Sequence, residues 1–132
     1  MKVREIVSGP ACQISSSAML SEAAERMRTL HASALPVVED NQVVGIVTSR
    51  DAAVNIARPG VNPRTTPVRD VMTKQSACCS QDDDVQTAAR IMEENQVHRL
   101  IVLGPDQKAV GILSRRQLAR ETGDVKLQRS RF

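Results

Sequence analysis

The sequence predicts a mixed α/β (α+β) fold, in which two β-α-β-β-α repeats pack sheet to sheet with pseudo-twofold symmetry. Three features indicate this fold: the pattern of the chain recurs at a fixed spacing, its strands are apolar on both faces, and its helices have one apolar face. The chain has 132 residues, of which 41% are hydrophobic and 25% are charged, so it suits one compact unit or two small halves with a shared core.

An internal duplication covers most of the chain. Three pairs of segments recur at a spacing of 65 residues: Val3–Val7 and Val68–Met72, Ser21–Met27 and Gln86–Met92, Ala34–Val38 and Arg99–Leu103. GIVTSRDAA recurs as GILSRRQLA at a spacing of 66, so one residue is inserted in a turn near Lys108. We therefore expect four parts: repeat 1 at 1–57, a linker rich in proline at 58–67, repeat 2 at 68–123 and a basic tail at 124–132.

Each repeat is expected to begin with an amphipathic helix. In repeat 1, Ser17 is expected to cap a helix, and its expected apolar face is Leu20, Ala23, Met27 and Leu30. In repeat 2, Asp82 or Asp83 is the expected cap, and the expected inward face is Val85, Ala88, Ala89 and Met92.

A hairpin and a second helix are expected to complete each repeat. The strands are expected at Ala34–Val38 and Val43–Thr48 in repeat 1, and at Val97–Leu103 and Ala109–Ser114 in repeat 2. Short polar turns between them predict antiparallel hairpins. The closing helices are expected at Ser49–Ala57 and Arg115–Thr122, with Gly123 as a C-terminal cap.

Composition excludes several classes of protein. The only aromatic residue is a single phenylalanine, so an aromatic platform that stacks bases is excluded. The start of the chain has no apolar signal segment, and no apolar run reaches the length of a membrane span. With three cysteines, an odd number, we expect free thiols in the cytoplasm. We expect no enzyme, because no phosphate-binding glycine loop, zinc-binding helix or activated nucleophile is recognisable.

The repeated phrase at the strand-to-helix junction differs in one charge. Thr48 and Asp51 have the spacing of a capping box, and Ser114 with Gln117 fits that motif as well or better. A purely structural interpretation therefore needs no ligand. A functional interpretation gives Asp51 a role as acceptor for the two hydroxyls of a ribose, a role that neutral Gln117 does not fill.

A second difference places cations in repeat 2. His98 and Arg99 stand at the start of a strand where repeat 1 has Ser33 and Ala34, and Arg116 stands at the start of the following helix. Arginine binds phosphate through paired hydrogen bonds, and a helix N-terminus favours anions. A diol acceptor from one repeat and cations from the other would together suit a nucleotide.

On these residues the chain resembles a tandem pair of cystathionine-β-synthase (CBS) domains, a Bateman module. The resemblance spans nearly all of residues 1–122. It implies a regulatory module that binds an adenine nucleotide (AMP, ADP, ATP or S-adenosylmethionine) in one inter-repeat cleft and signals by a conformational or dimer change. It also implies a homodimer that forms through the helices, and no cofactor other than this regulatory ligand.

The resemblance assigns roles to particular residues. It implies that Thr48 and Asp51 hold the ribose, while Ile46 lines the base. The remaining implied contacts are the adenine edge at Ser76, Ala77 and Cys78, a base wall at Val97, and phosphate at His98 and Arg99, with Arg69 and Arg116 as weaker phosphate candidates. Because Gln117, Ser33 and Ala34 depart from the family pattern, one cleft is expected to be equipped and the second to be deficient.

One alternative function stays open from the sequence. The clefts could be empty and the protein a scaffold that binds an effector protein or nucleic acid through its surface and basic tail.

The cysteines Cys12, Cys78 and Cys79 are expected to be small buried thiols. Their spacing gives only a weak signal for metal, and we expect no metal site.

Overall fold

The structure, a computed structural model, describes residues 1–123, and the predicted basic tail at 124–132 lies outside the described residues. The described chain contains two sheets and four α-helices, which confirms the mixed α+β fold. It forms two compact units. Unit 2 is Cys12–Ser76, and unit 1 combines Met1–Ala11 with the chain from Ala77 onward.

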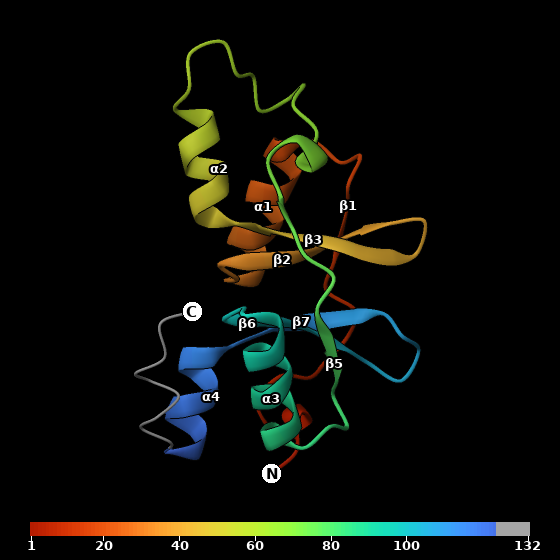
Figure 1. The fold of residues 1–132 in the computed structure, drawn as a ribbon. Helices are drawn as coiled ribbons and strands as arrows, with labels where there is room; N and C mark the ends of the chain where they lie inside the picture. The colour runs from red at the N-terminus through yellow and green to blue at the C-terminus, as the bar shows by residue number, and fades with distance from the viewer. Residues whose placement is uncertain (124–132) are drawn as a thin grey trace. The chain divides into compact units, whose positions relative to one another are not determined.

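Unit 2 follows the expected β-α-β-β-α order. Its elements are β1 (Ile14–Ser15), α1 (Leu20–Leu30), β2 (Ala34–Glu39), β3 (Gln42–Thr48), α2 (Ser49–Ile56), the 3-10 turn η2 (Val68–Asp70) and β4 (Thr73–Lys74). The strands form a sheet in the order β1-β2-β3-β4, in which β1 is parallel to β2 and the other pairs are antiparallel (Figure 1). The helices α1 and α2 pack against each other, and α1 buries Leu20, Ala23 and Met27 in the core of this unit.

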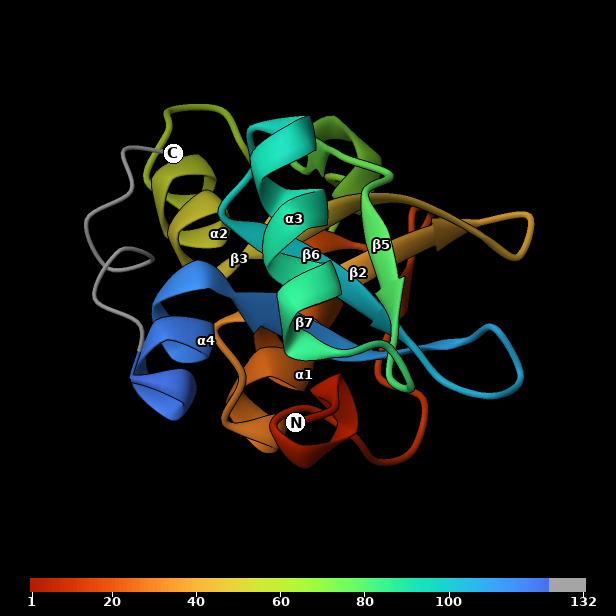
Figure 2. The same cartoon turned by 60° about the horizontal axis from the view of Figure 1, so that its bottom comes forward.

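Unit 1 has the same order of elements. They are η1 (Val3–Glu5), β5 (Cys78–Ser80), α3 (Val85–Asn95), β6 (Arg99–Leu103), β7 (Ala109–Ser114) and α4 (Arg115–Thr122). The sheet order is β5-β6-β7, with β5 parallel to β6 and β7 antiparallel to it. Figure 2 shows α3 and α4 on the same side of this sheet. Met92, Leu100, Leu113 and Leu118 are fully buried in the core of this unit.

The two predicted hairpins are confirmed, and their turns differ in length. Asp40 and Asn41 connect β2 to β3 with φ values of 51° and 63°. Two consecutive residues with positive φ match the twist of a two-residue hairpin, and Asp and Asn tolerate this conformation. The turn from β6 to β7 is longer: Gly104 N–H donates to the carbonyl of Lys108, so the inserted residue lies in this loop.

The first segment of each sequence repeat packs in the other repeat's unit. In unit 1, Val3 N–H donates to the carbonyl of Asp83 over 2.9 Å, and the Val3 side chain is fully buried. In unit 2, Val68 N–H donates to the carbonyl of Ala18 over 2.8 Å, and Val68 is likewise buried. Each packing unit therefore contains the first segment of the other sequence repeat. The predicted repeat boundaries describe the sequence duplication and stay a prediction.

The predicted N-terminal caps of the first helices are wrong. The Ser17 hydroxyl bonds the Ser15 hydroxyl, and Met19, which has no capping side chain, precedes α1. In unit 1 the cap of α3 is Asp84, whose carboxylate accepts from Gln86 N–H over 2.9 Å, while Asp83 accepts from Ser80 N–H. Several neighbouring residues could accept at these positions, and the turn geometry selects among them. Gly123, with φ of 71°, caps α4 as expected.

One residue of the predicted apolar face of α1 is exposed. Leu30 is 49% exposed, whereas Met27 is 4% exposed. The helix ends at Leu30 because His31 adopts the left-handed conformation with φ of 52°. The last turn of α1 thus lies at the edge of the packed region.

Candidate functional site

Thr48 and Asp51 form a reciprocal capping box where β3 passes into α2. The Thr48 backbone N–H donates to Oδ2 of Asp51 over 2.9 Å, and the Asp51 backbone N–H donates to Oγ1 of Thr48 over 3.0 Å. Asp51 is the third residue of α2, where its negative charge also interacts favourably with the helix dipole. The two side chains are therefore held together in a fixed arrangement.

The capping box leaves hydrogen-bonding capacity for a ligand. Each carboxylate oxygen accepts up to two hydrogen bonds, and a threonine hydroxyl that accepts one bond keeps its own proton to donate. Asp51 thus retains Oδ1, and Thr48 retains its O–H. The structural and functional interpretations of this motif are compatible, because the cap positions both groups without using all their acceptors.

The equivalent motif in unit 1 is only half formed. Oγ of Ser114 accepts from Gln117 N–H over 3.0 Å. Within residues 1–123, the Gln117 side chain makes no return bond to the Ser114 N–H. The expectation that Ser114 and Gln117 fit the capping box as well or better is therefore wrong, and the change from Asp51 to Gln117 removes both a charge and a bond.

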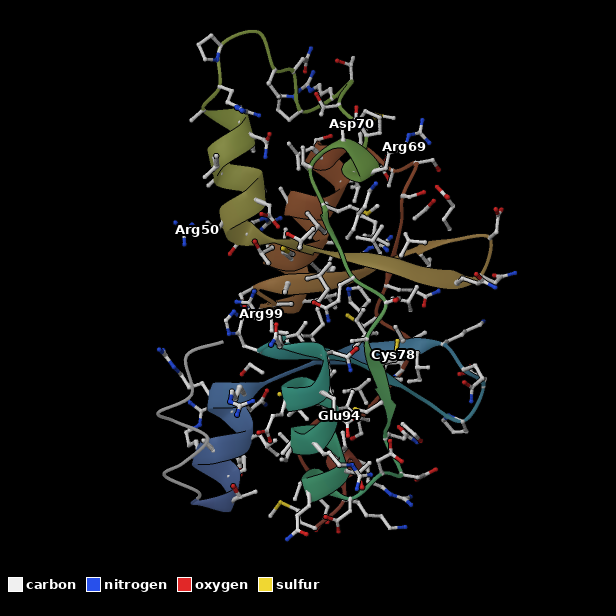
Figure 3. All side chains as sticks on the ribbon, in the orientation of Figure 1. Arg50, Arg69, Asp70, Cys78, Glu94 and Arg99 are labelled. Atoms are coloured by element: carbon white, nitrogen blue, oxygen red, sulfur yellow. The ribbon has the colours of Figure 1, made fainter. Side chains whose placement is uncertain are left out.

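Unit 1 presents cations beside its half-formed motif, where unit 2 has Ser33 and Ala34. Arg99, which is labelled in Figure 3, begins β6, and its register partner in β7 is Ser114. His98 precedes it, and its carbonyl accepts from the Arg115 N–H over 2.7 Å. The side chains of His98, Arg99 and Arg116 are exposed. In unit 2 the register partner of Thr48 is Ala34, so Thr48 is opposite a small apolar residue rather than a cation.

Three further predicted site residues lie in unit 2. Ile46 is in β3, where its register partners are Pro36 of β2 and Thr73 of β4. Ser76 is exposed and follows β4. Arg69 lies in η2, with its backbone N–H donating to the carbonyl of Ser16, and its side chain is exposed (Figure 3).

The remaining predicted residues lie in unit 1. The carbonyl of Ala77 accepts from the Ile101 N–H over 3.2 Å, and Cys78 is opposite Ile101 in the β5–β6 pair. Burial raises the pKa of the Cys78 thiol. Val97 is half-buried and packs against the core of its own unit. The expected roles of these residues toward an adenine ring stay predictions.

The structure adds residues that sequence reasoning missed. Nδ2 of Asn55 donates to the backbone carbonyl of Asp51 over 2.7 Å and so stabilises the first turn of α2. An open surface groove, most of whose lining residues are exposed, also lies in unit 2 between α1 and α2. The repeat comparison carries a signal for this groove, because Ser33, Ser49 and Ala52 align with the larger His98, Arg115 and Leu118.

The described residues give no sign of a metal centre. Over residues 1–123, no group of three or more His, Cys, Asp or Glu side chains is placed to hold a metal ion. The three cysteines are free thiols. None of the helices in this part of the chain is both long enough and apolar enough to cross a membrane.

Comparison with known families identifies the repeated unit. The model of the CBS domain family matches the chain twice, at residues 3–58 and 68–124. The chain belongs to the CBS domain family. The two matches confirm a tandem CBS domain pair. Thr48 and Asp51 lie in the first match, and Ser114 and Gln117 lie in the second.

Curated relatives are similar over most of the pair. An inosine-5'-monophosphate dehydrogenase of Methanocaldococcus jannaschii is 31% identical over 118 residues, which is 89% of this chain but 23% of the dehydrogenase. An uncharacterized 17.7 kDa protein of Acidianus ambivalens is 31% identical over 125 residues, covering 94% of this chain and 74% of that protein. The pair thus spans less than a quarter of the length of the dehydrogenase that it matches.

Solved CBS structures share the fold. The CBS domain pair of protein MJ0100, in complex with 5-methylthioadenosine and S-adenosyl-L-methionine, is 25% identical with a TM-score of 0.69, covering 93% of this chain and 96% of that one. The CBS domain protein TA0289 of Thermoplasma acidophilum is 25% identical with a TM-score of 0.71, covering 97% of this chain and 72% of that one.

Proposed function

We propose that this CBS domain pair is a non-enzymatic regulatory module that binds one adenine nucleotide. The candidates are AMP, ADP, ATP and S-adenosylmethionine. The observation that carries the proposal is that each unit supplies a different chemistry at its strand-to-helix junction. Thr48 and Asp51 supply a fixed hydroxyl and carboxylate, whereas the matching region of unit 1 supplies His98 and Arg99. The pair of MJ0100, which is similar in fold and sequence, was solved with two adenosine compounds.

Each set of residues suits a different part of a nucleotide. The free carboxylate oxygen of Asp51 and the hydroxyl of Thr48 suit the ribose diol. The guanidinium of Arg99 suits phosphate or carboxylate, and Arg116 at the start of α4 adds positive charge. We propose that one ligand uses both sets, with Ile46 and Val97 contacting the base. Such a ligand transmits a signal only if its affinity differs between two states of the protein.

Calorimetric titration of the protein with each of the four nucleotides tests the proposal. We expect one ligand per chain, and we expect Asp51→Asn to weaken binding about tenfold or more, because a hydrogen bond to a charged group contributes about 1.5–3 kcal/mol. Arg99→Ala should weaken the same binding event. The matched control, Gln117→Asn, should bind like the wild type. The proposal fails if no nucleotide binds at millimolar concentration, or if Asp51→Asn has no effect.

We also propose that the pair forms a homodimer in the cytoplasm. The free thiols are compatible with a reducing compartment. Light scattering on a size-exclusion column, with and without the nucleotide that binds, tests the dimer. A monomer under both conditions would contradict it.

A further inference from the structure

The edge of β7 that faces away from β6 differs between the two units in whether a strand covers it. In unit 2 the equivalent edge belongs to β3, and β4 covers it, with Thr73 opposite Ile46 in an antiparallel pair. The Gln75 N–H extends this pair by donating to the Val44 carbonyl over 3.2 Å. In unit 1, within residues 1–123, β7 pairs with β6 alone and is the last strand of its sheet.

The sequence explains why β7 has no such strand beside it. At the repeat spacing of 65, residues 8–11 correspond to residues 73–76. Pro10 stands in the place of Gln75 and has no N–H to donate. Gly9 has φ of 129°, a conformation that glycine adopts readily and other residues rarely adopt. This segment is exposed, and in the described chain no backbone hydrogen bond joins it to β7.

Ile112 carries the hydrogen-bonding groups of this edge. The Arg115 N–H donates to the His98 carbonyl over 2.7 Å, so the backbone N–H of Arg115 points to β6. Backbone groups alternate in direction along an antiparallel strand, so those of Ile112, three residues earlier, point away from β6. Ile112 corresponds to Ile46, which β4 covers in unit 2, and its side chain is half-buried. The Ile112 N–H and carbonyl are therefore placed to pair with an added strand.

The composition of β7 favours pairing with a further strand. Edge strands that stay unpaired usually carry charged residues or proline, and β7, with the sequence AVGILS, has neither. Extended peptides bind such edges by adding a strand, and their main-chain hydrogen bonds provide the affinity. In unit 2, Thr73 and Lys74 of β4 are exposed, so this strand too is held by its backbone rather than by buried side chains.

The charges around β7 favour an acidic partner. Residues 104–117 contain three basic residues and one acidic residue, Asp106. Lys108, directly before β7, and Arg116, two residues after it, are exposed. An extended peptide with carboxylates near its ends would therefore be attracted to both ends of this edge.

The same charges disfavour the two occupants that the chain itself could supply. Antiparallel pairing of β7 with β7 of a second copy, centred on Ile112, would place Lys108 of one copy opposite Arg116 of the other, and like charges directly opposite each other are destabilising. Residues 124–132 contain three basic residues and one acidic residue, so their net charge has the same sign as that of the edge. An acidic peptide from another protein avoids both conflicts.

We propose that the outer edge of β7 binds an extended acidic peptide of a partner protein as an antiparallel strand. The peptide backbone would exchange hydrogen bonds with Ile112, as Thr73 of β4 pairs with Ile46 in unit 2. Its carboxylates would face Lys108 and Arg116. The inference does not rest on the proposed nucleotide site, because main-chain groups of β7 make the pairing.

Nuclear magnetic resonance titration with a peptide copied from β4 and its flanks tests the proposal. The probe is the capped peptide of residues 70–77, DVMTKQSA, with Lys74→Glu and Ala77→Glu. We expect saturable amide shift changes at Ile112 and its neighbours in β7 at millimolar peptide. The peptide that keeps Lys74 and carries Ala77→Lys should bind about tenfold more weakly. Equal affinity for both peptides, shifts centred on β3, or no shift in β7 would overturn the proposal.

Two N-methylated forms of the acidic probe test the backbone pairing directly. The Gln75 N–H faces β3, so by alternation the N–H of Thr73 also faces it and the N–H of residue 74 points away. If the probe binds β7 as β4 binds β3, methylation at position 73 should abolish binding, and methylation at position 74 should be tolerated. Equal effects of the two methyl groups would overturn the proposal.

A variant of the protein tests the contribution of charge. Lys108→Glu reverses the charge beside β7 and should weaken the acidic probe about tenfold, whereas the matched control Arg64→Glu, in unit 2, should leave its affinity unchanged. Both residues are exposed, so both variants should keep the fold. Unchanged affinity in Lys108→Glu would overturn the preference for an acidic peptide.

Sedimentation velocity, with and without the acidic probe, separates this pairing from self-association. Probe binding that leaves the oligomeric state unchanged would support the proposal. A dimer of the wild type that the probe dissociates would assign the edge of β7 to a second copy and overturn it.

Discussion

The side chains of Thr48 and Asp51 each accept a hydrogen bond from the other's backbone N–H. This reciprocal pair makes Asp51 both a structural residue of α2 and the candidate ribose acceptor. Substitutions at this position therefore need to separate the two roles. Asparagine keeps an acceptor oxygen for the Thr48 N–H and removes the charge, whereas alanine removes both.

We expect Asp51→Ala to lower the free energy of unfolding by about 1 kcal/mol, because a net intramolecular hydrogen bond contributes about 0.5–1.5 kcal/mol. Asp51→Asn should lower it by clearly less. Urea denaturation measures both values. Gln117→Ala is the matched control in unit 1 and should have little effect, since the Gln117 side chain does not complete a capping box. A Gln117→Ala effect as large as that of Asp51→Ala would contradict this interpretation.

Gly45 is required by the close approach of β4 to β3. A Cβ atom at this position would lie 2.6 Å from the carbonyl oxygen of Thr73 and 2.9 Å from Sδ of Met72. We expect Gly45→Ala to lower the free energy of unfolding by roughly 1–3 kcal/mol, the usual cost of overpacking. In Gly111→Ala the new Cβ atom would lie 2.8 Å from Cγ1 of Val7, and a side chain moves more easily than a strand. Thermal unfolding of both variants should give the smaller loss for Gly111→Ala.

Two alanine substitutions on α1, Met27→Ala and Leu30→Ala, should differ sharply in how much they lower the free energy of unfolding. Met27 is buried, so Met27→Ala should lower the free energy of unfolding by about 2–5 kcal/mol. Leu30 is three residues further along the helix and largely exposed, so Leu30→Ala should change it by less than about 0.5 kcal/mol. Chemical denaturation tests the pair. Equal losses would mean that the last turn of α1 is buried in solution.

The Cys79 thiol should be unreactive at neutral pH. Burial is the main cause that raises its pKa from 9.0 to about 12, and the negative charges of Asp83 and Cys78 add to the shift. Because the thiolate is the nucleophile, Cys79 should react with a disulfide reagent more slowly in the folded protein than after unfolding. Reagent kinetics on Cys12→Ser/Cys78→Ser, which leaves Cys79 alone, measure this rate.

The same shift predicts how stability depends on pH. Since the unfolded thiol loses its proton near pH 9.0 and the folded thiol near pH 12, the stabilisation is present below pH 9 and is lost as the pH rises toward 12. Unfolding of Cys79→Ala should show a weaker decline over this window than the wild type. An identical decline in the two proteins would rule out Cys79 as its source.

Element type and order could be predicted from the sequence because the repeat shows the same pattern twice. The helix Arg115–Thr122 and the strand Ala109–Ser114 have the predicted bounds. The N-cap of α3 could not be predicted, because Asp82, Asp83 and Asp84 are chemically alike and only the path of the chain decides which carboxylate meets the first free N–H groups of the helix.

The candidate site was predictable in its residue types and less so in its detailed bonding. Thr48 and Asp51 could be identified from their spacing. The half-formed box at Ser114 and Gln117 depends on a side-chain conformation, which spacing alone does not determine. The open groove beside Ser33 and Ser49 depends on the difference between the two repeats. Such a groove can be predicted only when corresponding residues are compared by volume rather than by similarity.

Because the two units exchange their first segments, they become complete at different times during synthesis. Unit 2 is one continuous stretch, so it is complete as soon as Ser76 has left the ribosome. Unit 1 needs both Met1–Ala11 and the residues from Ala77 onward. Val3 therefore cannot reach its buried position in unit 1 until the residues from Ala77 onward have also been translated.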